Sequence, residues 1–389
     1  VCTDWQAAEV QLCQLGDAAL LVVPDSLTAL QRVAAHWRLQ HKVRVIGITG
    51  CVGKSISKEY IAAVLRQRYR TLRSEGSYNN EIGLPLTLLH VTGLTERVVL
   101  EMGMYDTGEI AQLAGIAAPQ VGVVTNVGPT HLERLGTIER IAKAKAELPQ
   151  ALPPAGEGGV AILNTDDEWV RGMVGQTAAR VFTYGLGPGA DLWADKVESD
   201  GLEGIRLRFH HAGETVDIRV PMLGHHSAHT ALCAAAVGLS EGLTWSEIVA
   251  GLHDPSAQLR LVVQPGPDGS TILDDTYNAS PVSCTAALDL LDELQGRKIA
   301  VLGDMYELGS YEKEGHKLVG RHARNVADLL ITVGQLGCII GREAIRSGMP
   351  SDAVLMVETN AQAVTSLRAI IADGPGCDHV LVKGSRGMG

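Results

Sequence analysis

Apolar residues occur along this chain in two patterns, continuous short runs and helical spacing. The alternation of these patterns predicts alternating strands and helices. Short apolar runs at 43–49, 98–102, 121–127 and 160–164 have the length of buried strands. Segments between these runs show the helical spacing of apolar residues. Strands that alternate with helices in this way predict an α/β unit with a mostly parallel sheet covered by helices.

The alternation of strands and helices is interrupted near the middle of the chain and then resumes. Strand-like runs at 205–209 and 215–220 flank His211-Ala-Gly, which predicts a β-hairpin. From about residue 259 the alternation begins again, and it predicts a second, doubly wound α/β unit that binds ligands at the carboxyl ends of its strands. The strand-like runs of this second unit are 271–273, 298–302, 329–333, 353–357 and 379–382.

The first forty residues differ from both units. They contain one short apolar strand at 19–23 and one helical pattern at 27–37, which is too little for an independent core. We therefore expect three parts: the end of an incomplete N-terminal domain at 1–42, a central unit at 43–257 and a C-terminal unit at 258–389.

Composition narrows the classes of function. The 389 residues are 46% hydrophobic and 20% charged, so the chain can bury sizeable cores. Its net charge of −11 argues against nucleic-acid partners, which need clustered Lys and Arg. Seven cysteines lack the spacing of a zinc site or a disulfide framework, and no apolar run is long enough to cross a bilayer. We expect a cytoplasmic protein that does not insert into membranes.

A glycine-rich segment follows the strand at 43–49 and opens a helix. It reads Ile-Gly-Ile-Thr-Gly-Cys-Val-Gly-Lys-Ser from 46 to 55. Backbone N–H groups of such a loop cradle phosphate oxygens, Lys54 would reach the terminal phosphates, and Ser55 would ligate Mg²⁺. The glycines at 47, 50 and 53 depart from the strict spacing, so the alternative is a glycine-rich turn with an incidental lysine.

Two candidate metal ligands follow the next strands. Glu101 ends the strand at 98–102, and His131 lies in the loop after the strand at 121–127. Mg²⁺ that bridges phosphate oxygens prefers oxygen ligands, which Glu101 supplies. His131 is an unusual ligand for Mg²⁺, and by itself it is more typical of an ordinary loop or core histidine.

Seven motifs in one order resemble the Mur ligase family, over about residues 16–389. The most specific are Asn-Asn-Glu-Ile-Gly-Leu-Pro at 79–85 and Gly-Asp-Met-Tyr-Glu-Leu-Gly at 303–309. They point to the branch that joins D-Ala-D-Ala to UDP-N-acetylmuramoyl-tripeptide. The others are Glu-Met-Gly at 101–103, Thr-Asn-Val-Gly-Pro-Thr-His at 125–131, Asn-Thr-Asp-Asp at 164–167, Asp-Asp-Thr-Tyr-Asn-Ala-Ser-Pro at 274–281 and Val-Lys-Gly-Ser-Arg at 382–386.

This resemblance implies a fold, a reaction and its partners. The fold has a UDP-sugar domain, here mostly missing, a central P-loop-type ATPase and a C-terminal Rossmann-like domain. ATP with Mg²⁺ phosphorylates the carboxylate of UDP-N-acetylmuramoyl-tripeptide, and the amine of D-Ala-D-Ala then attacks the acyl phosphate. The product belongs to peptidoglycan precursor synthesis, and we expect a monomer.

The resemblance also implies roles for individual residues. Lys54, His131, Lys145 and Arg260 match catalytic positions, and Lys145 matches a lysine that is carbamylated in relatives. The implied metal ligands are Ser55, Glu101, His131 and Lys145. The implied nucleotide-binding residues are Gly50, Gly53, Lys54, Ser55, Asn126, Thr230 and Asp275, and the implied substrate-binding residues are Asn79, Asn80, Asn278, Lys383, Ser385 and Arg386.

The sequence leaves two rival interpretations open. One is another amide ligase of the same superfamily, acting on a different amino acid or on polyglutamate. The other is a nucleotide-binding homologue without catalysis, which two departures favour: Val52 stands where relatives often have Asn, and Thr230 stands where the family usually has the Asn that binds adenine. An active ligase is favoured by the presence of all five catalytic and metal-binding candidates: Lys54, Ser55, Glu101, His131 and Lys145.

Overall fold

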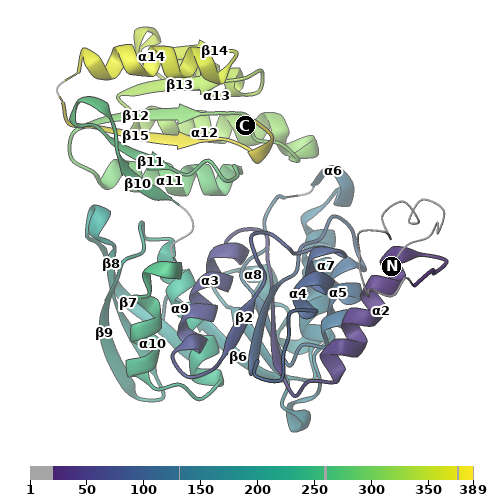
Figure 1. Ribbon diagram of the computed structural model, residues 1–389. Coiled ribbons are helices and arrows are strands. Elements are labelled where there is room, and N and C mark those ends of the chain that lie inside the picture. The colour runs from purple at the N-terminus through teal and green to yellow at the C-terminus, as the bar shows by residue number, and fades with distance from the viewer. Residues whose placement is uncertain (1–20, 131, 258–260, 375, 389) are drawn as a thin grey trace, which may run out of the picture.

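The structure, a computed structural model, describes residues 21–130, 132–257, 261–374 and 376–388. Its strands form two separate sheets, a nine-stranded one in the central part of the chain and a six-stranded one in the C-terminal part. Figure 1 shows the two units, with the C-terminal sheet above the central one. The expected α/β class with two mostly parallel sheets is therefore confirmed.

The central sheet has the strand order β2-β3-β1-β4-β5-β6-β7-β8-β9. Its first seven strands pair in parallel, and the last two join as the antiparallel hairpin that the sequence predicts. The bounds are β1 Arg44–Thr49, β2 Thr71–Arg73, β3 Arg97–Glu101, β4 Val121–Val124, β5 Val160–Asn164, β6 Arg180–Gly185, β7 Leu192–Ser199, β8 Ile205–His211 and β9 Glu214–Val220.

Helices cover both faces of this sheet because successive strand residues point to opposite sides. In β1, Ile46 and Ile48 pack with the helices of one face, and Val45 packs with those of the other. The first face carries α3 (Lys54–Arg66), α9 (Ser227–Ser240) and α10 (Trp245–Leu252). The second carries α2 (Ser26–Leu39), α4 (Gly83–Leu88), α5 (Glu109–Ala117), α6 (Leu132–Leu135), α7 (Ile138–Gln150) and α8 (Glu168–Arg171).

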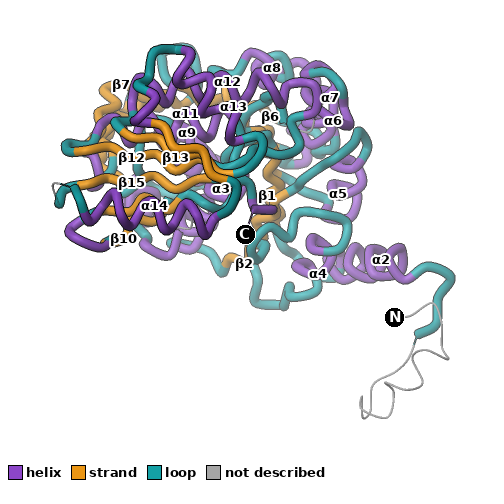
Figure 2. Tube along the Cα trace, turned by 90° about the horizontal axis from the view of Figure 1, so that it is seen from above, coloured by secondary structure: helices purple, strands orange, loops and turns teal. Residues whose placement is uncertain are grey.

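Helix α2 packs onto the central unit. It contacts α4 and α5, and Ala34 is buried in the same core as those helices. Both views of the molecule show α2 beside α4 (Figures 1 and 2). The strand expected at 19–23 is not found at 21–23, and its first two residues lie outside the described part of the chain. Whether 1–42 ends a separate domain stays a prediction.

The C-terminal sheet has the order β10-β11-β15-β12-β13-β14, with only β10 antiparallel. One core lies under α11 (Pro281–Glu293), α12 (Glu312–Val326) and α13 (Gly337–Arg346), and a smaller core lies under α14 (Asn360–Ala372) on the other face. The strands are β10 Val262–Pro265, β11 Thr271–Asp274, β12 Arg297–Leu302, β13 Leu329–Val333, β14 Val354–Val357 and β15 Asp378–Lys383.

The described residues bear on two expectations, which concern membrane-spanning segments and the state of the cysteines. No helix in the described ranges is long and apolar enough to span a bilayer. The five cysteines within those ranges, at 51, 233, 284, 338 and 377, are all free thiols.

Candidate active site

The carboxyl ends of four neighbouring strands bring together the loops that carry the sequence motifs. Strands β3, β1, β4 and β5 are adjacent and parallel, so their ends lie along one edge of the sheet. This edge carries Glu101 at the end of β3, the glycine-rich loop after β1, Asn126 after β4 and Asn164 at the end of β5.

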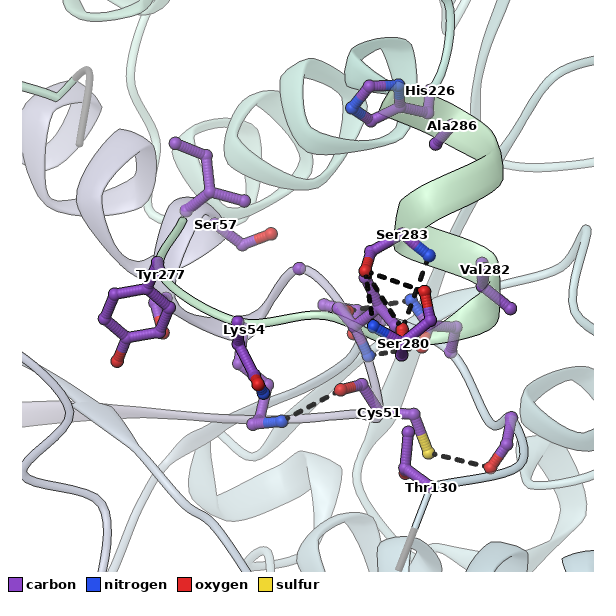
Figure 3. Close-up of a pocket in the computed structure, with 18 of the residues that line it drawn as sticks. Cys51, Lys54, Ser57, Thr130, His226, Tyr277, Ser280, Val282, Ser283 and Ala286 are labelled. Atoms are coloured by element: carbon purple, nitrogen blue, oxygen red, sulfur yellow. Dashed lines mark hydrogen bonds between the residues drawn. The ribbon is translucent and has the colours of Figure 1, made fainter. Parts of the chain in front are cut away.

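A cavity of about 810 Å³ lies between this edge and the C-terminal unit. Both units line it, so residues more than two hundred positions apart in the sequence meet across it. Figure 3 shows Cys51, Lys54 and Thr130 of the central unit facing Tyr277 and the start of α11. The sequence-predicted residues that line it are Gly53, Lys54, Ser55, Asn79, Glu101, Asn126, Thr230, Asp275, Asn278, Lys383, Ser385 and Arg386.

The glycine-rich loop has backbone angles that only glycine adopts readily. Gly53 is the N-cap of α3 and has a φ of 84°, in the left-handed region. A Cβ at Gly50 would lie 1.9 Å from Oγ1 of Thr125, so a side chain at this position would collide with the loop after β4. The loop therefore presents the N-terminus of α3 to the cavity, which is a favourable place for phosphate.

Lys54 lies at the start of α3 and bends back over its own loop. Its Nζ donates to the backbone oxygens of Gly50 (2.8 Å) and Cys51 (3.2 Å), and Figure 3 shows the bond to Cys51. These are weak local partners that phosphate oxygens can replace. The position fits the predicted contact with the terminal phosphates of ATP.

Asn126 braces the loop from the neighbouring strand. Its Oδ1 accepts from the backbone N of Val52, and its Nδ2 donates to the backbone O of Val52, each at 2.8 Å. Thr125 Oγ1 also donates to the same oxygen at 2.8 Å. Val52 is thus fixed by its backbone, which any residue offers, so the absence of Asn at this position does not weaken the loop.

Glu101 is the best-placed metal ligand among the described residues. It is 2% exposed, and its Oε1 accepts from Nδ2 of Asn79 at 2.8 Å. Within the described ranges its other oxygen, Oε2, is buried without a hydrogen-bond partner. An unpaired buried carboxylate oxygen is costly, and a bound cation would satisfy it. Glu101 and Ser55, which line the same cavity, therefore fit Mg²⁺.

Lys145 lies buried near this carboxylate on α7. It is 1% exposed, whereas Lys143 two positions earlier is exposed, as the opposite directions of these helix positions require. Burial, with the charge of Lys54 nearby, lowers the pKa of Lys145 to about 7. With a pKa of about 7, about half of the Lys145 amine is neutral at pH 7, and the neutral amine is the form that can react with CO₂.

Lys383 and Asp275 form a buried ion pair at the C-terminal side of the cavity. Lys383 Nζ contacts Oδ2 of Asp275 at 2.5 Å and donates to the backbone O of Asn278 at 2.8 Å. This pair joins the ends of β15 and β11, and it holds the segment after β11 against the cavity.

Arg386 reaches across to the central unit. Its Nη1 donates to Oγ of Ser77 at 3.4 Å, and its guanidinium lies 5.9 Å from the centre of the Tyr277 ring. Ser385 is buried, and its Oγ accepts from the backbone N of Tyr306 at 2.9 Å. Arg386 thus brings a positive charge into the cavity, while Ser385 fixes the loop behind it.

Two family models match this chain along almost all of these residues. The model described as the Mur ligase middle domain matches residues 48–238, and the one described as the Mur ligase glutamate ligase domain matches residues 259–386. The chain belongs to the Mur ligase family.

Named relatives agree with this assignment. The chain is 37% identical over 396 residues to UDP-N-acetylmuramoyl-tripeptide–D-alanyl-D-alanine ligase of Mycobacterium bovis, covering 96% of this chain and 76% of the relative. It is 36% identical over 374 residues to the ligase of the same name from Bacillus subtilis, covering 95% and 79%.

Solved Mur ligase structures share the fold. A crystal structure of MurF from Acinetobacter baumannii has a TM-score of 0.86 at 30% identity and covers 96% of this chain and 81% of its own. The MurF ligase of Thermotoga maritima in complex with ADP has a TM-score of 0.81 at 26% identity, covering 96% and 83%.

Five of the predicted site residues are not among the described residues that line the cavity: Gly50, Asn80, His131, Lys145 and Arg260. His131 and Arg260 lie outside the described residues. Asn80 is absent from the described lining residues, and its Oδ1 accepts from the backbone N of Gly83 at 2.9 Å, at the start of α4. The Asn80 side chain therefore stabilises the turn that leads into α4, and a direct contact with substrate stays a prediction.

The structure also adds residues that the sequence analysis did not single out for the site. Ser77 and Tyr277 line the cavity around Arg386. His229 Nε2 lies 2.7 Å from Oδ2 of Asp166, and this pair borders the cavity beside Thr230. Tyr277 and Asp166 lie inside the motifs at 274–281 and 164–167, and Ser77 lies just before the motif at 79–85, so these motifs were the available signal. The signal for His229 was its position next to Thr230.

Proposed function

We propose that this Mur ligase joins D-Ala-D-Ala to UDP-N-acetylmuramoyl-tripeptide, using ATP to activate the tripeptide carboxylate as an acyl phosphate. The proposal rests on one arrangement: the phosphate loop with Lys54 and the buried carboxylate of Glu101 face Lys383 and Arg386 across a single cavity. Phosphate chemistry and recognition of anionic peptide groups can thus occur in one enclosed space. The relatives that are 36–37% identical to this chain are named for these two substrates.

The central unit supplies the groups that bind the triphosphate. The backbone N–H groups at the start of α3 and the ammonium of Lys54 stabilise the negative charge of the transferred phosphoryl group. Mg²⁺, held by Glu101 and Ser55, would lower the charge repulsion between the triphosphate and the attacking carboxylate. Asn79 orients the Glu101 carboxylate for this contact.

Lys145 is proposed to complete the metal site as a carbamate. Reaction of its neutral amine with CO₂ forms an N–C bond and releases one proton, which turns a cationic side chain into an anionic ligand. His131, which lies outside the described residues, is the other proposed ligand.

The C-terminal unit supplies the proposed peptide-binding groups. Arg386 carries the charge and the planar donor geometry that pair with a peptide carboxylate. Lys383, Ser385 and Asn278 fix the two loops from which such a contact is made. Enclosure between the units keeps water from hydrolysing the acyl phosphate before the amine attacks. We propose that 43–257 and 258–389 are the two units that enclose the reaction, and that the enzyme is a cytoplasmic monomer.

Thr230 is proposed to contribute to adenine binding through its hydroxyl and backbone. It lines the cavity at the start of α9, next to the His229–Asp166 pair. A hydroxyl cannot offer the paired donor and acceptor of Asn. We therefore expect weaker selection of adenine over guanine than in relatives with Asn at this position.

The test is product formation with defined substrates. The enzyme is incubated with ATP, Mg²⁺ and UDP-N-acetylmuramoyl-tripeptide, with D-Ala-D-Ala, D-Ala or L-Glu as the amine, and products are resolved by mass spectrometry. Only D-Ala-D-Ala should give rapid amide formation with one ADP per product. A faster reaction with L-Glu would favour another ligase of the superfamily, and no turnover with any amine would favour a homologue without catalysis.

A further inference from the structure

Lys58 is a buried cation that none of the steps above uses. It lies on α3 one turn after Lys54, and it is 0% exposed. Burial of an ammonium group costs several kcal/mol of free energy unless its hydrogen bonds are satisfied. An apolar residue at this helix position would avoid this desolvation cost. A charge in such a place therefore calls for a specific set of partners.

The partners of Lys58 connect α3 with one irregular segment. Its Nζ donates to the backbone oxygens of Ser74 (2.8 Å) and Gly76 (2.7 Å) and lies 3.1 Å from Oε1 of Glu59. These three contacts match the three donors of an ammonium group. Segment 74–80, which follows the edge strand β2, is thus tied to the helix that begins at the phosphate loop.

Segment 74–80 holds the candidate metal ligand in place. Ser74 Oγ accepts from the backbone N of Glu101 at 3.2 Å, and Ser74 N donates to the O of Val99 at 3.0 Å. Asn79, five residues on, donates to the Glu101 carboxylate at 2.8 Å. The segment therefore contacts both the backbone and the side chain of Glu101.

The same segment also meets the C-terminal unit. Ser77 lines the cavity and accepts from Arg386 at 3.4 Å. Lys58 binds the residue directly before Ser77, since Gly76 O is one of its two backbone partners. A change at Lys58 would therefore shift groups on the metal side and the peptide side of the cavity, but not the phosphate loop itself.

We propose that Lys58 is a positioning residue, which couples the phosphate-loop helix to segment 74–80 and so sets the place of Glu101 and Ser77 relative to the bound nucleotide. The inference deepens the proposed function and rests on it for the substrate. Loss of the ammonium group should weaken the metal site and slow turnover, because groups that orient a metal ligand commonly contribute 10- to 100-fold, roughly, to affinity or rate.

The experiment compares Lys58→Met with a matched control, Glu241→Gln. Glu241 is also buried. It pairs with Arg44 (2.6 Å) and Arg97 (2.7 Å), which lie at the amino ends of β1 and β3, whereas the site lies at the carboxyl ends of these strands. Both variants remove a buried ionic contact of the central unit, but only Lys58→Met should move the site. Calorimetry gives the ADP affinity, and electron paramagnetic resonance of Mn²⁺ gives the cation affinity of the ADP complex.

Lys58→Met should keep its ADP affinity in the absence of a divalent cation within about two-fold, while its Mn²⁺ affinity and kcat fall by about 10-fold or more. Glu241→Gln should keep all three values near those of the wild type. Unchanged Mn²⁺ affinity and kcat in Lys58→Met would overturn the proposal, as would equal losses in both variants. The Mn²⁺ measurement needs no turnover, so a failure of the proposed substrate assignment is recognised separately, by a wild type that binds ADP and Mn²⁺ but forms no amide.

A second variant covers the case in which Lys58→Met does not fold. Ser74→Ala leaves Lys58 and its backbone partners in place and removes only the hydroxyl that accepts from Glu101 N. It should lower the Mn²⁺ affinity by several-fold with ADP affinity unchanged. A Ser74→Ala protein with wild-type Mn²⁺ affinity would overturn the coupling through segment 74–80.

Discussion

The side-chain amide of Asn79 binds only one of the two carboxylate oxygens of Glu101: Nδ2 donates to Oε1 at 2.8 Å, and in the described part of the chain the buried Oε2 has no hydrogen-bond partner. The amide fixes the carboxylate plane and leaves the second oxygen directed to another group. In a family that uses nucleotides, a divalent cation is the group that satisfies such an oxygen best.

Replacement of Glu101 by Gln should raise the Mg²⁺ concentration needed for half-maximal rate by about 10-fold or more, because the amide keeps an oxygen for Asn79 but loses the charge. The rate is measured against Mg²⁺ at saturating ATP. The control is Glu147→Gln, since both oxygens of Glu147 already accept backbone N–H groups, at 2.7 Å from Gly108 and 3.0 Å from Ala111. An equal Mg²⁺ requirement in wild type and Glu101→Gln would remove Glu101 from the metal site.

Lys54→Ala should reduce kcat by at least about 100-fold, the usual effect of removing one group that stabilises transition-state charge. Its described hydrogen bonds go only to loop carbonyls, so the midpoint of urea unfolding should barely move. Steady-state kinetics measure the loss of kcat, and an unfolding curve on the same preparation measures the midpoint. A folded Lys54→Ala protein that retains ATP-dependent amide formation would show that this loop does not bind the triphosphate.

Lys145→Ala should lose activity, whereas Lys143→Ala should keep it, because only Lys145 is buried beside the site. Small carboxylic acids such as formate should restore part of the activity of Lys145→Ala by filling the place of the carbamate. Protein prepared under ¹³CO₂ should show a carbamate resonance in the wild type and in Lys143→Ala but not in Lys145→Ala. If both variants are fully active, this site does not use a carbamate.

His316 should make the stability of the C-terminal unit depend on pH. It is buried; its Nε2 accepts from the backbone N of Met305 (3.0 Å), and its Nδ1 lies 2.6 Å from the backbone O of Glu312. Burial lowers its pKa, so the folded state favours the neutral ring. The unfolded chain then binds more protons below its ordinary value near 6.5, and stability is lost as the pH falls from there towards the lowered folded pKa.

The corresponding measurement is urea unfolding at pH 7.5 and 5.5 for the wild type and His316→Gln. The midpoint of the wild type should fall more steeply between the two pH values than that of the variant, which has no titrating ring. If the midpoint of urea unfolding fell equally in both proteins, His316 would not be the cause of the pH dependence.

The sequence predicted the continuously apolar strands that carry the site better than short or charged strands. The runs ending at Thr49 and Asn164 became β1 and β5 almost residue by residue, because buried parallel strands are continuously apolar. Strands β2, β6, β7 and β10 were not predicted. Strand β7 carries charged residues on its exposed face, and β2 has only three residues, so neither gives a long apolar run.

The site was predicted as a set of residues more successfully than as a set of contacts. Spacing and strand order were enough to expect Lys54 and Glu101 together, because the ends of β1 and β3 must meet in a parallel sheet. That Asn126 braces Val52 and that Lys58 binds segment 74–80 depends on which backbone groups lie nearby after folding. Such contacts join positions between 16 and 74 residues apart, and no local pattern records them.

The measurement that tests the central claim most directly is the fate of carboxylate oxygen. UDP-N-acetylmuramoyl-tripeptide with both oxygens of its reacting carboxylate labelled with ¹⁸O is incubated with the enzyme, ATP, Mg²⁺ and D-Ala-D-Ala, and the released phosphate is analysed by mass spectrometry. An acyl phosphate transfers one labelled oxygen to each phosphate as the amide forms, and this is the result we predict. Amide formation with unlabelled phosphate, or with the label in AMP, would contradict the proposed function.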